Sequence, residues 1–200
     1  MIKDANVEIS LRAMREDEFE GYRAYFVADY AQEIMDNYGH SNVVALKMAQ
    51  TAIETSFPKG ITPENQALLS IDLLDPRDET ALAEVVEHAQ EELNADECEQ
   101  NRSKSEQNTD NSERAQLAGY LWRMINEEDE SCFISDFYII PSMRSKGLGK
   151  LAIRALEEDM KALGIKQIKL RVAYQNNRAA ELYKAMGFTI TGINMSKLLV

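Results

Sequence analysis

The sequence is poor in cysteine, histidine and long apolar runs. Its 200 residues include two cysteines, Cys98 and Cys132, and two histidines, His40 and His88. Two cysteines do not make a disulfide framework, and they indicate reduced thiols in a cytosolic protein. Their spacing with the histidines matches no zinc site, so we expect no metal. No apolar run is long enough to cross a bilayer and no secretory signal is visible, so we expect a cytoplasmic protein without a membrane partner.

Basic side chains are in the minority, and the net charge is −12. Residues 75–130 hold 17 acidic and 5 basic side chains, which accounts for the whole excess, and the remainder of the chain is neutral. Because nucleic-acid phosphates repel such a chain, we expect no nucleic-acid partner. The acidic segment permits a cationic partner, although a solvated acidic face is the commoner meaning.

The hydrophobic pattern predicts one domain of mixed α/β class, with one sheet carrying helices on its faces. The expected strands are 7–11, 67–74, 117–125, 132–140, 165–173, 188–190 and 193–200, and the expected helices are 16–37, 42–55, 147–163 and 177–186. An acidic insert at about 76–115 separates the second and third strands. It has a helical pattern at 79–93 and a polar, aperiodic stretch at 95–113, which we interpret as a mobile loop.

The strand, turn and helix start at 136–150 predict an anion site. Gly147 and Gly149 leave backbone N–H groups without side-chain cover at the positive end of a helix dipole. Arg144, Lys146 and Lys150 add cations in the same place. The pattern therefore favours a phosphate or pyrophosphate over its plainer interpretation, a glycine-containing turn with solvated basic residues.

Two nucleotide motifs compete for this segment. The P-loop pattern does not fit. The dinucleotide fingerprint is formally present at Gly147, Gly149 and Ala152, which leaves a nucleotide-binding oxidoreductase as an alternative. That match is weak because no acidic residue closes the next strand, 165–173, and only about fifty residues follow.

A second stretch decides between these alternatives. Arg144 to Gly149 fits [R/Q]-x-x-G-x-[G/A], and Asn177 to Phe188 is similar to N-x-x-A-x-x-L-Y-x-x-x-G-F, with the alanine one residue either way. Together, on successive elements, these stretches resemble the GNAT superfamily of N-acetyltransferases. The resemblance covers residues 117–200, and the insert at about 76–115 departs from it, so it informs the coenzyme site more than the acceptor site.

The resemblance implies a single domain over residues 1–200, an α/β (α+β) fold. Its mixed, mostly antiparallel sheet is splayed between the fourth and fifth strands, with helices on both faces. It also implies acetyl-CoA as acyl donor and direct transfer to a primary amine, the acceptor being a small molecule or a peptide. A homodimer is compatible with it. The residues expected at the coenzyme are Ile139, Ile140, Arg144, Ser145, Lys146, Gly147, Leu148, Gly149, Lys150 and Asn177.

The resemblance also suggests two catalytic residues. Tyr183 would protonate or stabilise the leaving thiolate, since a phenol is protonated at neutral pH. The helical pattern alone favours Tyr183 as a core aromatic, and the family motif reverses that preference. Asp136, the carboxylate of the fourth strand, is a candidate general base. The alternative, which we weigh equally, is that Asp136 is only a solvent-facing or hydrogen-bonded strand residue. A non-catalytic acyl-CoA-binding module stays open as a second function.

The acceptor pocket in such proteins often involves the first two helices. The side chains that would line it are Tyr22, Tyr25, Asp29, Tyr30 and Glu33. Carboxylates with aromatic rings suit a cationic amine. Such a stripe is more often core on one side and solvated charge on the other, and from sequence alone we favour that interpretation.

Overall fold

A computed structural model describes residues 7–61, 65–74, 115–195 and 197. The expected insert at about 76–115, with its helix at 79–93 and its loop at 95–113, lies outside these described residues except at its last position.

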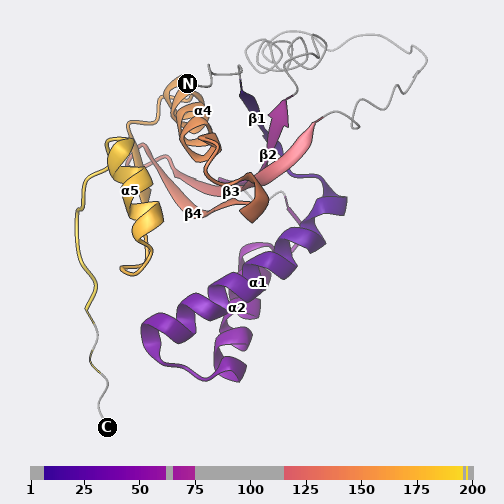
Figure 1. Ribbon diagram of the computed structural model, residues 1–200, viewed down its shortest axis with the longest axis vertical. Helices are drawn as coiled ribbons and strands as arrows, with labels where there is room; N and C mark the ends of the chain where they lie inside the picture. Colours follow the sequence, from indigo (N-terminus) through magenta and orange to yellow (C-terminus); the bar gives the residue numbers. More distant parts are fainter. Residues whose placement is uncertain (1–6, 62–64, 75–114, 196, 198–200) are drawn as a thin grey trace.

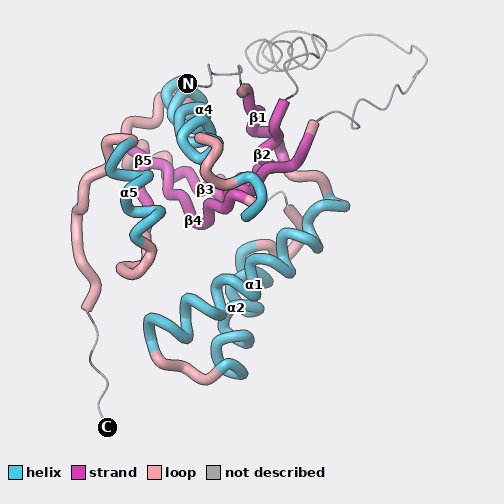
Figure 2. The backbone as a smooth tube through the Cα atoms, in the orientation of Figure 1, coloured by secondary structure: helices cyan, strands magenta, loops and turns pink. Residues whose placement is uncertain are grey.

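A five-stranded sheet forms the centre of the described structure (Figures 1 and 2). Its strands are β1 (Glu8–Ala13), β2 (Gln66–Leu74), β3 (Gln116–Asn126), β4 (Ser131–Ile139) and β5 (Gln167–Leu170). They lie in sequence order, antiparallel except for the parallel pair β4–β5. The predicted mixed, mostly antiparallel sheet is therefore confirmed.

Helices cover both faces of this sheet, as predicted (Figure 1). They are α1 (Glu16–Tyr38) and α2 (Asn42–Ser56) on one face, and α4 (Leu148–Ala162) and α5 (Asn177–Ala185) on the other. Acidic residues fill the first turn of α1, where they complement the helix dipole, and Gly39 ends it in the left-handed conformation. Every predicted helix among the described residues is present within one or two residues of its expected ends.

The helix α4 is anchored by a narrow apolar face. Leu148, Ala152, Leu156 and Met160 recur at every fourth position and are almost fully buried. That spacing places them on one side of the helix, against the sheet and α5. Their burial fixes the start of α4 beside the end of β4, and so sets the geometry of the intervening loop.

An ion-pair network holds the start of α1 on the opposite side of the sheet. The guanidinium of Arg12 on β1 bonds Glu18 of α1 at 2.7 Å and Asp72 of β2 at 2.6 Å. Ser70 also donates to Glu18 at 3.2 Å. Burial alone would raise the pKa of Glu18, but its bonds with Arg12 lower that pKa to about 2. The network fixes where α1 lies across β1 and β2.

The sheet splits between β4 and β5. The two strands pair only from Ser131–Ile134 to Gln167–Leu170. Beyond this point β4 stays paired with β3, while no described residue pairs with its other edge from Ser135 to Ile139. A bulge at Ser135 bends the strand at the same place, because Trp122 faces Asp136 whereas Arg123 faces Ile134. The predicted splay is thus confirmed.

The carboxyl-terminal strands differ from expectation. The fifth strand, predicted at 165–173, covers only Gln167–Leu170 because the chain turns away from β4 at the split. The predicted strands at 188–190 and 193–200 are wrong for the described part of these ranges, 188–195 and 197, which is not in a strand. An alternating pattern makes a strand only where a neighbour accepts its hydrogen bonds. Here Ile193 and Met195 are 76% and 94% exposed.

Candidate active site

The loop from β4 to α4 presents a row of unused backbone donors. Ser145 and Gly147 have φ of 65° and 82°, the left-handed region. In this conformation the N–H groups of residues 145–149 donate to no backbone or side-chain acceptor among the described residues. The intrahelical bonds begin only with Lys150, whose N–H donates to Gly147 at 2.9 Å. Five consecutive free donors at a helix start form a cradle that suits an anion.

The cations predicted around this loop take different positions. Lys146 and Lys150 are exposed beside the free amides. Arg144 instead folds back on β4, where its Nε donates to the Ile139 carbonyl at 2.7 Å and its guanidinium lies 5.2 Å from the Tyr138 ring centroid. It is thereby oriented by the strand rather than standing free above the loop.

The helix α5 closes the other side of the loop. Gly149 makes this approach possible, because a Cβ there would lie 3.2 Å from Leu182 of α5. Arg178 of α5 reaches Ser145, with 3.4 Å from Nη2 to Oγ. The start of α5 is capped by Asn176, which accepts from the Ala179 N–H.

Two further residues expected at the coenzyme, Ile140 and Asn177, lie beside this loop. Ile140 donates its N–H to the Ala118 carbonyl of β3, so the N–H of the preceding residue, Ile139, faces the open edge of β4. Asn177 is exposed one position after the cap of α5.

Asp136 is the central carboxylate on the other side of the sheet. It accepts hydrogen bonds from the phenols of Tyr22 and Tyr25 of α1, both at 3.2 Å. Burial raises the pKa of Asp136 to about 7, although the two phenol bonds oppose that rise. Burial and the charge of Asp136 raise the pKa of both tyrosines, so they remain donors. A carboxyl poised near neutrality is suited to accept a proton.

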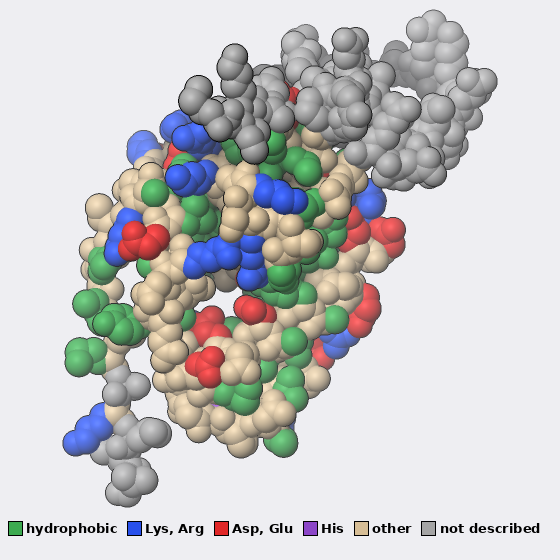
Figure 3. Space-filling model, viewed as in Figure 1, with side chains coloured by type: hydrophobic (Ala, Val, Ile, Leu, Met, Phe, Trp, Pro, Cys, Tyr) green, Lys and Arg blue, Asp and Glu red, His purple; other side chains and the backbone are tan. Residues whose placement is uncertain are grey.

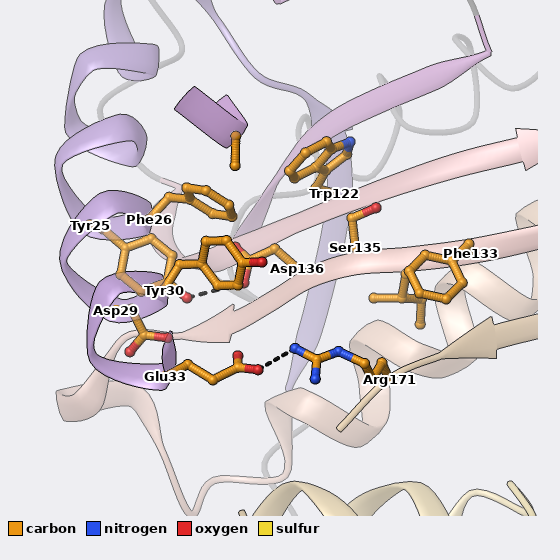
Figure 4. A pocket seen from close by; sticks show the side chains of 12 residues that line it. Tyr25, Phe26, Asp29, Tyr30, Glu33, Trp122, Phe133, Ser135, Asp136 and Arg171 are labelled. Carbon is orange, nitrogen blue, oxygen red and sulfur yellow. Dashed lines mark hydrogen bonds and ion pairs between the residues drawn. The ribbon is translucent and has the colours of Figure 1, made fainter. Parts of the chain in front are cut away.

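Asp136 lies in the wall of a cavity of about 250 Å³ between α1, α2 and the sheet (Figure 4). Its lining residues are Tyr25, Phe26, Asp29, Tyr30, Glu33, Ala52, Trp122, Phe133, Ile134, Ser135, Asp136 and Arg171. Four of the five side chains considered for an acceptor pocket are among them, and the fifth, Tyr22, holds Asp136 from behind. This stripe on α1 therefore faces a cavity. From sequence we favoured a different interpretation, with core packing on one side and solvated charge on the other.

An ion pair between distant segments borders the cavity. Arg171, just after β5, pairs with Glu33 of α1 and donates to the hydroxyl of Tyr38 at 3.3 Å. Figure 4 shows the Arg171 and Glu33 side chains facing each other, apart from Asp136. Sequence reasoning missed Arg171, because nothing in its neighbourhood distinguishes it from other basic residues.

Tyr183 lies in the core cluster between α4, α5 and the sheet. It is 9% exposed and packs edge-to-face against Phe188, with 5.4 Å between ring centroids. Burial, and then the charge of Asp136, raise the pKa of Tyr183. It is therefore a core aromatic and also a protonated phenol that senses the charge of Asp136.

Charges of opposite sign gather around a hollow on one face of the molecule. Figure 3 shows a hollow in the middle of one face, with Lys and Arg side chains above it and Asp and Glu below. Among the described residues, no helix is long and apolar enough to span a membrane, and no three potential metal ligands cluster together.

The comparisons with known proteins match this architecture. The model of the Acetyltransferase (GNAT) family matches residues 75–188, more than half of the chain. The chain belongs to the GNAT family. The resemblance drawn from the two sequence stretches is therefore confirmed, and with it the general assignment to acetyl transfer.

Several relatives carry related names. The uncharacterized N-acetyltransferase YdgE of Bacillus subtilis is 25% identical over 95% of this chain and 98% of its own length. The thialysine N-epsilon-acetyltransferase of Bos taurus is 36% identical over 34% of this chain and 40% of its own length. These matches place the GNAT chain among N-acetyltransferases without fixing its acceptor.

Solved structures show the same GNAT fold. The crystal structure of YycN from Bacillus subtilis has a TM-score of 0.71 at 24% identity, covering 96% of this chain and 99% of that one. The spermidine N-acetyltransferase from Vibrio cholerae, in complex with CoA and spermine, has a TM-score of 0.54 at 16% identity, covering 96% and 88%.

Proposed function

We propose that this protein transfers an acetyl group from acetyl-CoA to a primary amine by direct attack in a ternary complex. The observation that carries the proposal is Asp136. This carboxyl with a pKa near 7 faces a cavity of acceptor size, on the strand whose open edge leads to the amide cradle. A cavity of about 250 Å³ equals roughly eight water molecules, enough for a small amine.

Asp136 would act as the general base. An amine must be neutral to attack a thioester, and it must lose a further proton as the bond forms. The carboxylate of Asp136 can take that proton directly or through a water, while Tyr22 and Tyr25 hold it in place. Above pH 7 the group is mostly ionised, so the reaction would be supported at physiological pH.

The amide cradle fits the diphosphate of coenzyme A. The free N–H groups of residues 145–149 supply donors, and Lys146 and Lys150 supply charge. When bound, acetyl-CoA would supply the activated acetyl thioester. The open edge of β4, including the N–H of Ile139, is available for the extended part of the coenzyme between the cradle and the cavity, whereas the Ile139 carbonyl already accepts from Arg144.

Tyr183 would stabilise the leaving thiolate by donating a hydrogen bond to it. Its phenol is held protonated by burial and by the neighbouring charge of Asp136. Because a thiolate is a weaker base than this phenolate, Tyr183 keeps its proton and donates a hydrogen bond to the thiolate as it leaves.

The cavity favours a cationic acceptor. Asp29, Glu33 and Asp136 supply carboxylates, and Tyr25 and Tyr30 supply aromatic faces. The names of two similar proteins, acting on thialysine and on spermidine, are consistent with an amine of this kind.

The decisive experiment measures thiol release from acetyl-CoA against a panel of diamines, polyamines, amino acids and amino-terminal peptides. Calorimetry on the same protein measures acetyl-CoA affinity. We expect tight binding and turnover with at least one cationic amine. Binding without turnover beyond slow hydrolysis would favour the alternative of a non-catalytic acyl-CoA-binding module, and absence of binding would contradict both.

A further inference from the structure

The cavity has two ends of different charge. At one end Asp136 is held by Tyr25, and at the other Glu33 pairs with Arg171. Tyr25 and Glu33 are eight residues apart on α1, which corresponds to about 12 Å along the helix. An acceptor that touches both ends is therefore extended and carries recognisable groups at each end.

Arg171 makes the second end unusual. It is the only basic side chain among the described residues that line the cavity, and all other charged lining residues are acidic. Its side chain is 41% exposed and that of Glu33 is 30% exposed, so both remain reachable by a solute. A site built for a simple polycation would gain nothing from a guanidinium here, because like charges repel.

We propose that the acceptor is an α-amino acid whose side chain ends in a primary amine, with Arg171 and Glu33 as the residues that select it. This inference rests on the proposed function. The α-carboxylate pairs with the Arg171 guanidinium, the α-ammonium with Glu33, and the terminal amine lies at Asp136.

The exchange of ion pairs explains the selectivity. A zwitterionic head group replaces one internal ion pair with two pairs to the ligand, so neither Arg171 nor Glu33 is left without an opposite charge. A diamine offers only the cation. It pairs with Glu33 but leaves Arg171 beside a like charge, which disfavours binding.

Four acceptors separate these contributions. Lysine carries both head-group charges, cadaverine lacks the α-carboxylate, 6-aminohexanoate lacks the α-ammonium, and spermidine is a longer polycation. Thiol-release kinetics give kcat/KM for each acceptor, and mass spectrometry locates the acetyl group. For the wild type we expect lysine to exceed cadaverine roughly 10- to 100-fold, as for one charge-assisted contact, with the terminal amine acetylated.

Two variants test which protein residue recognises each charge of the head group. Arg171→Gln should lower kcat/KM for lysine and 6-aminohexanoate by roughly that same factor. For cadaverine it should leave kcat/KM unchanged or raise it, because the variant removes the like charge. Glu33→Gln should lower kcat/KM for lysine and cadaverine, which carry the second ammonium, and should not lower kcat/KM for 6-aminohexanoate. Lys169→Gln is the matched control, because Lys169 pairs with Asp129 and does not line the cavity, and it should change no ratio.

Two results would overturn the inference. One is cadaverine or spermidine serving as well as lysine in the wild type. The other is Arg171→Gln lowering activity with all acceptors alike, which would make Arg171 a structural bridge. Either result leaves the proposed acetyl transfer standing, whereas no thiol release with any amine would refute both.

Discussion

The two regions on either side of the open edge of β4 are built in opposite ways. The amide cradle comes from one continuous stretch, residues 145–149, and uses backbone donors. The cavity collects side chains from α1, α2, β3, β4 and the residue after β5. A backbone site requires glycine and positive charge within one turn, so the requirement is visible locally. A side-chain site needs suitable residues on elements that the fold brings into contact, and their positions in the sequence show no local pattern.

The two regions also differ in how solvent acts on them. Residues 145–147 of the cradle are exposed, so their donors are hydrated until an anion replaces the water. Asp136 is partly withdrawn from water, so its protonation changes near neutrality. The cradle should therefore respond mainly to charge changes, and the cavity mainly to pH.

The largest effect should follow from removing the base. Asp136→Asn should lower kcat/KM by about 10²- to 10⁴-fold, the usual contribution of a positioned base. For the wild type, kcat/KM corrected to neutral amine should rise with pH below about 7 and level off above it, and the variant should lack that rise. An unchanged pH profile in the variant would exclude Asp136 as the base.

The same variant tests the cost of the buried carboxylate. The pKa of Asp136 is about 7 in the fold, against about 3.9 in an unfolded chain. Between these values the folded state holds the additional proton, so this group's contribution to stability falls as pH rises from about 4 to 7. At pH 8 the free energy of unfolding of Asp136→Asn should therefore exceed that of the wild type by up to about 4 kcal/mol, and the difference should shrink toward pH 4. Denaturant unfolding of both proteins across this pH range measures the difference.

The cradle is tested by a pair of substitutions at Gly147. Gly147→Asp should weaken acetyl-CoA binding about 100-fold or more by calorimetry, because it places a negative charge at the anion site. Gly147→Asn has nearly the same shape and tolerates the φ of 82°, so it should retain affinity within about tenfold. Equal affinity in the two folded variants would move the diphosphate elsewhere.

A smaller effect is expected at Tyr183, the proposed hydrogen-bond donor to the thiolate. Tyr183→Phe keeps the packing against Phe188 and removes only the hydroxyl, so stability should change little. We expect kcat to fall about 10- to 100-fold with acetyl-CoA affinity unchanged, because the phenol would act only as the thiolate leaves. Wild-type turnover in this variant would leave Tyr183 with its core role alone.

The smallest effect should come from the phenols behind the base. Tyr25→Phe removes one hydrogen bond that favours the ionised form of Asp136, so the pH midpoint of kcat/KM should move from about 7 toward about 8. Tyr30→Phe is the control, since Tyr30 lines the same cavity without a hydrogen bond to Asp136. Equal midpoints in wild type and Tyr25→Phe would contradict the tuning role.

The sequence predicted those elements whose defining interactions lie within one short segment of the chain. The ends of α1 follow from its acidic first turn and from Gly39, and α4 follows from its four-residue apolar repeat. The carboxyl-terminal strands were wrong because alternation describes one chain, whereas a strand needs a second one beside it. Arg171 was missed for a related reason, since its partner Glu33 lies 138 positions away in the chain.

The sequence by itself determined the family, the mixed sheet and the place of the amide cradle, because glycine conformation, helix periodicity and motif spacing are local properties. Only the tertiary structure decided that the stripe on α1 faces a cavity, that two phenols hold Asp136, and that Arg171 meets Glu33. Those relations depend on how far β4 and β5 diverge and on where the Arg12 network holds α1. Both are set by packing between segments distant in the chain, which no local pattern records.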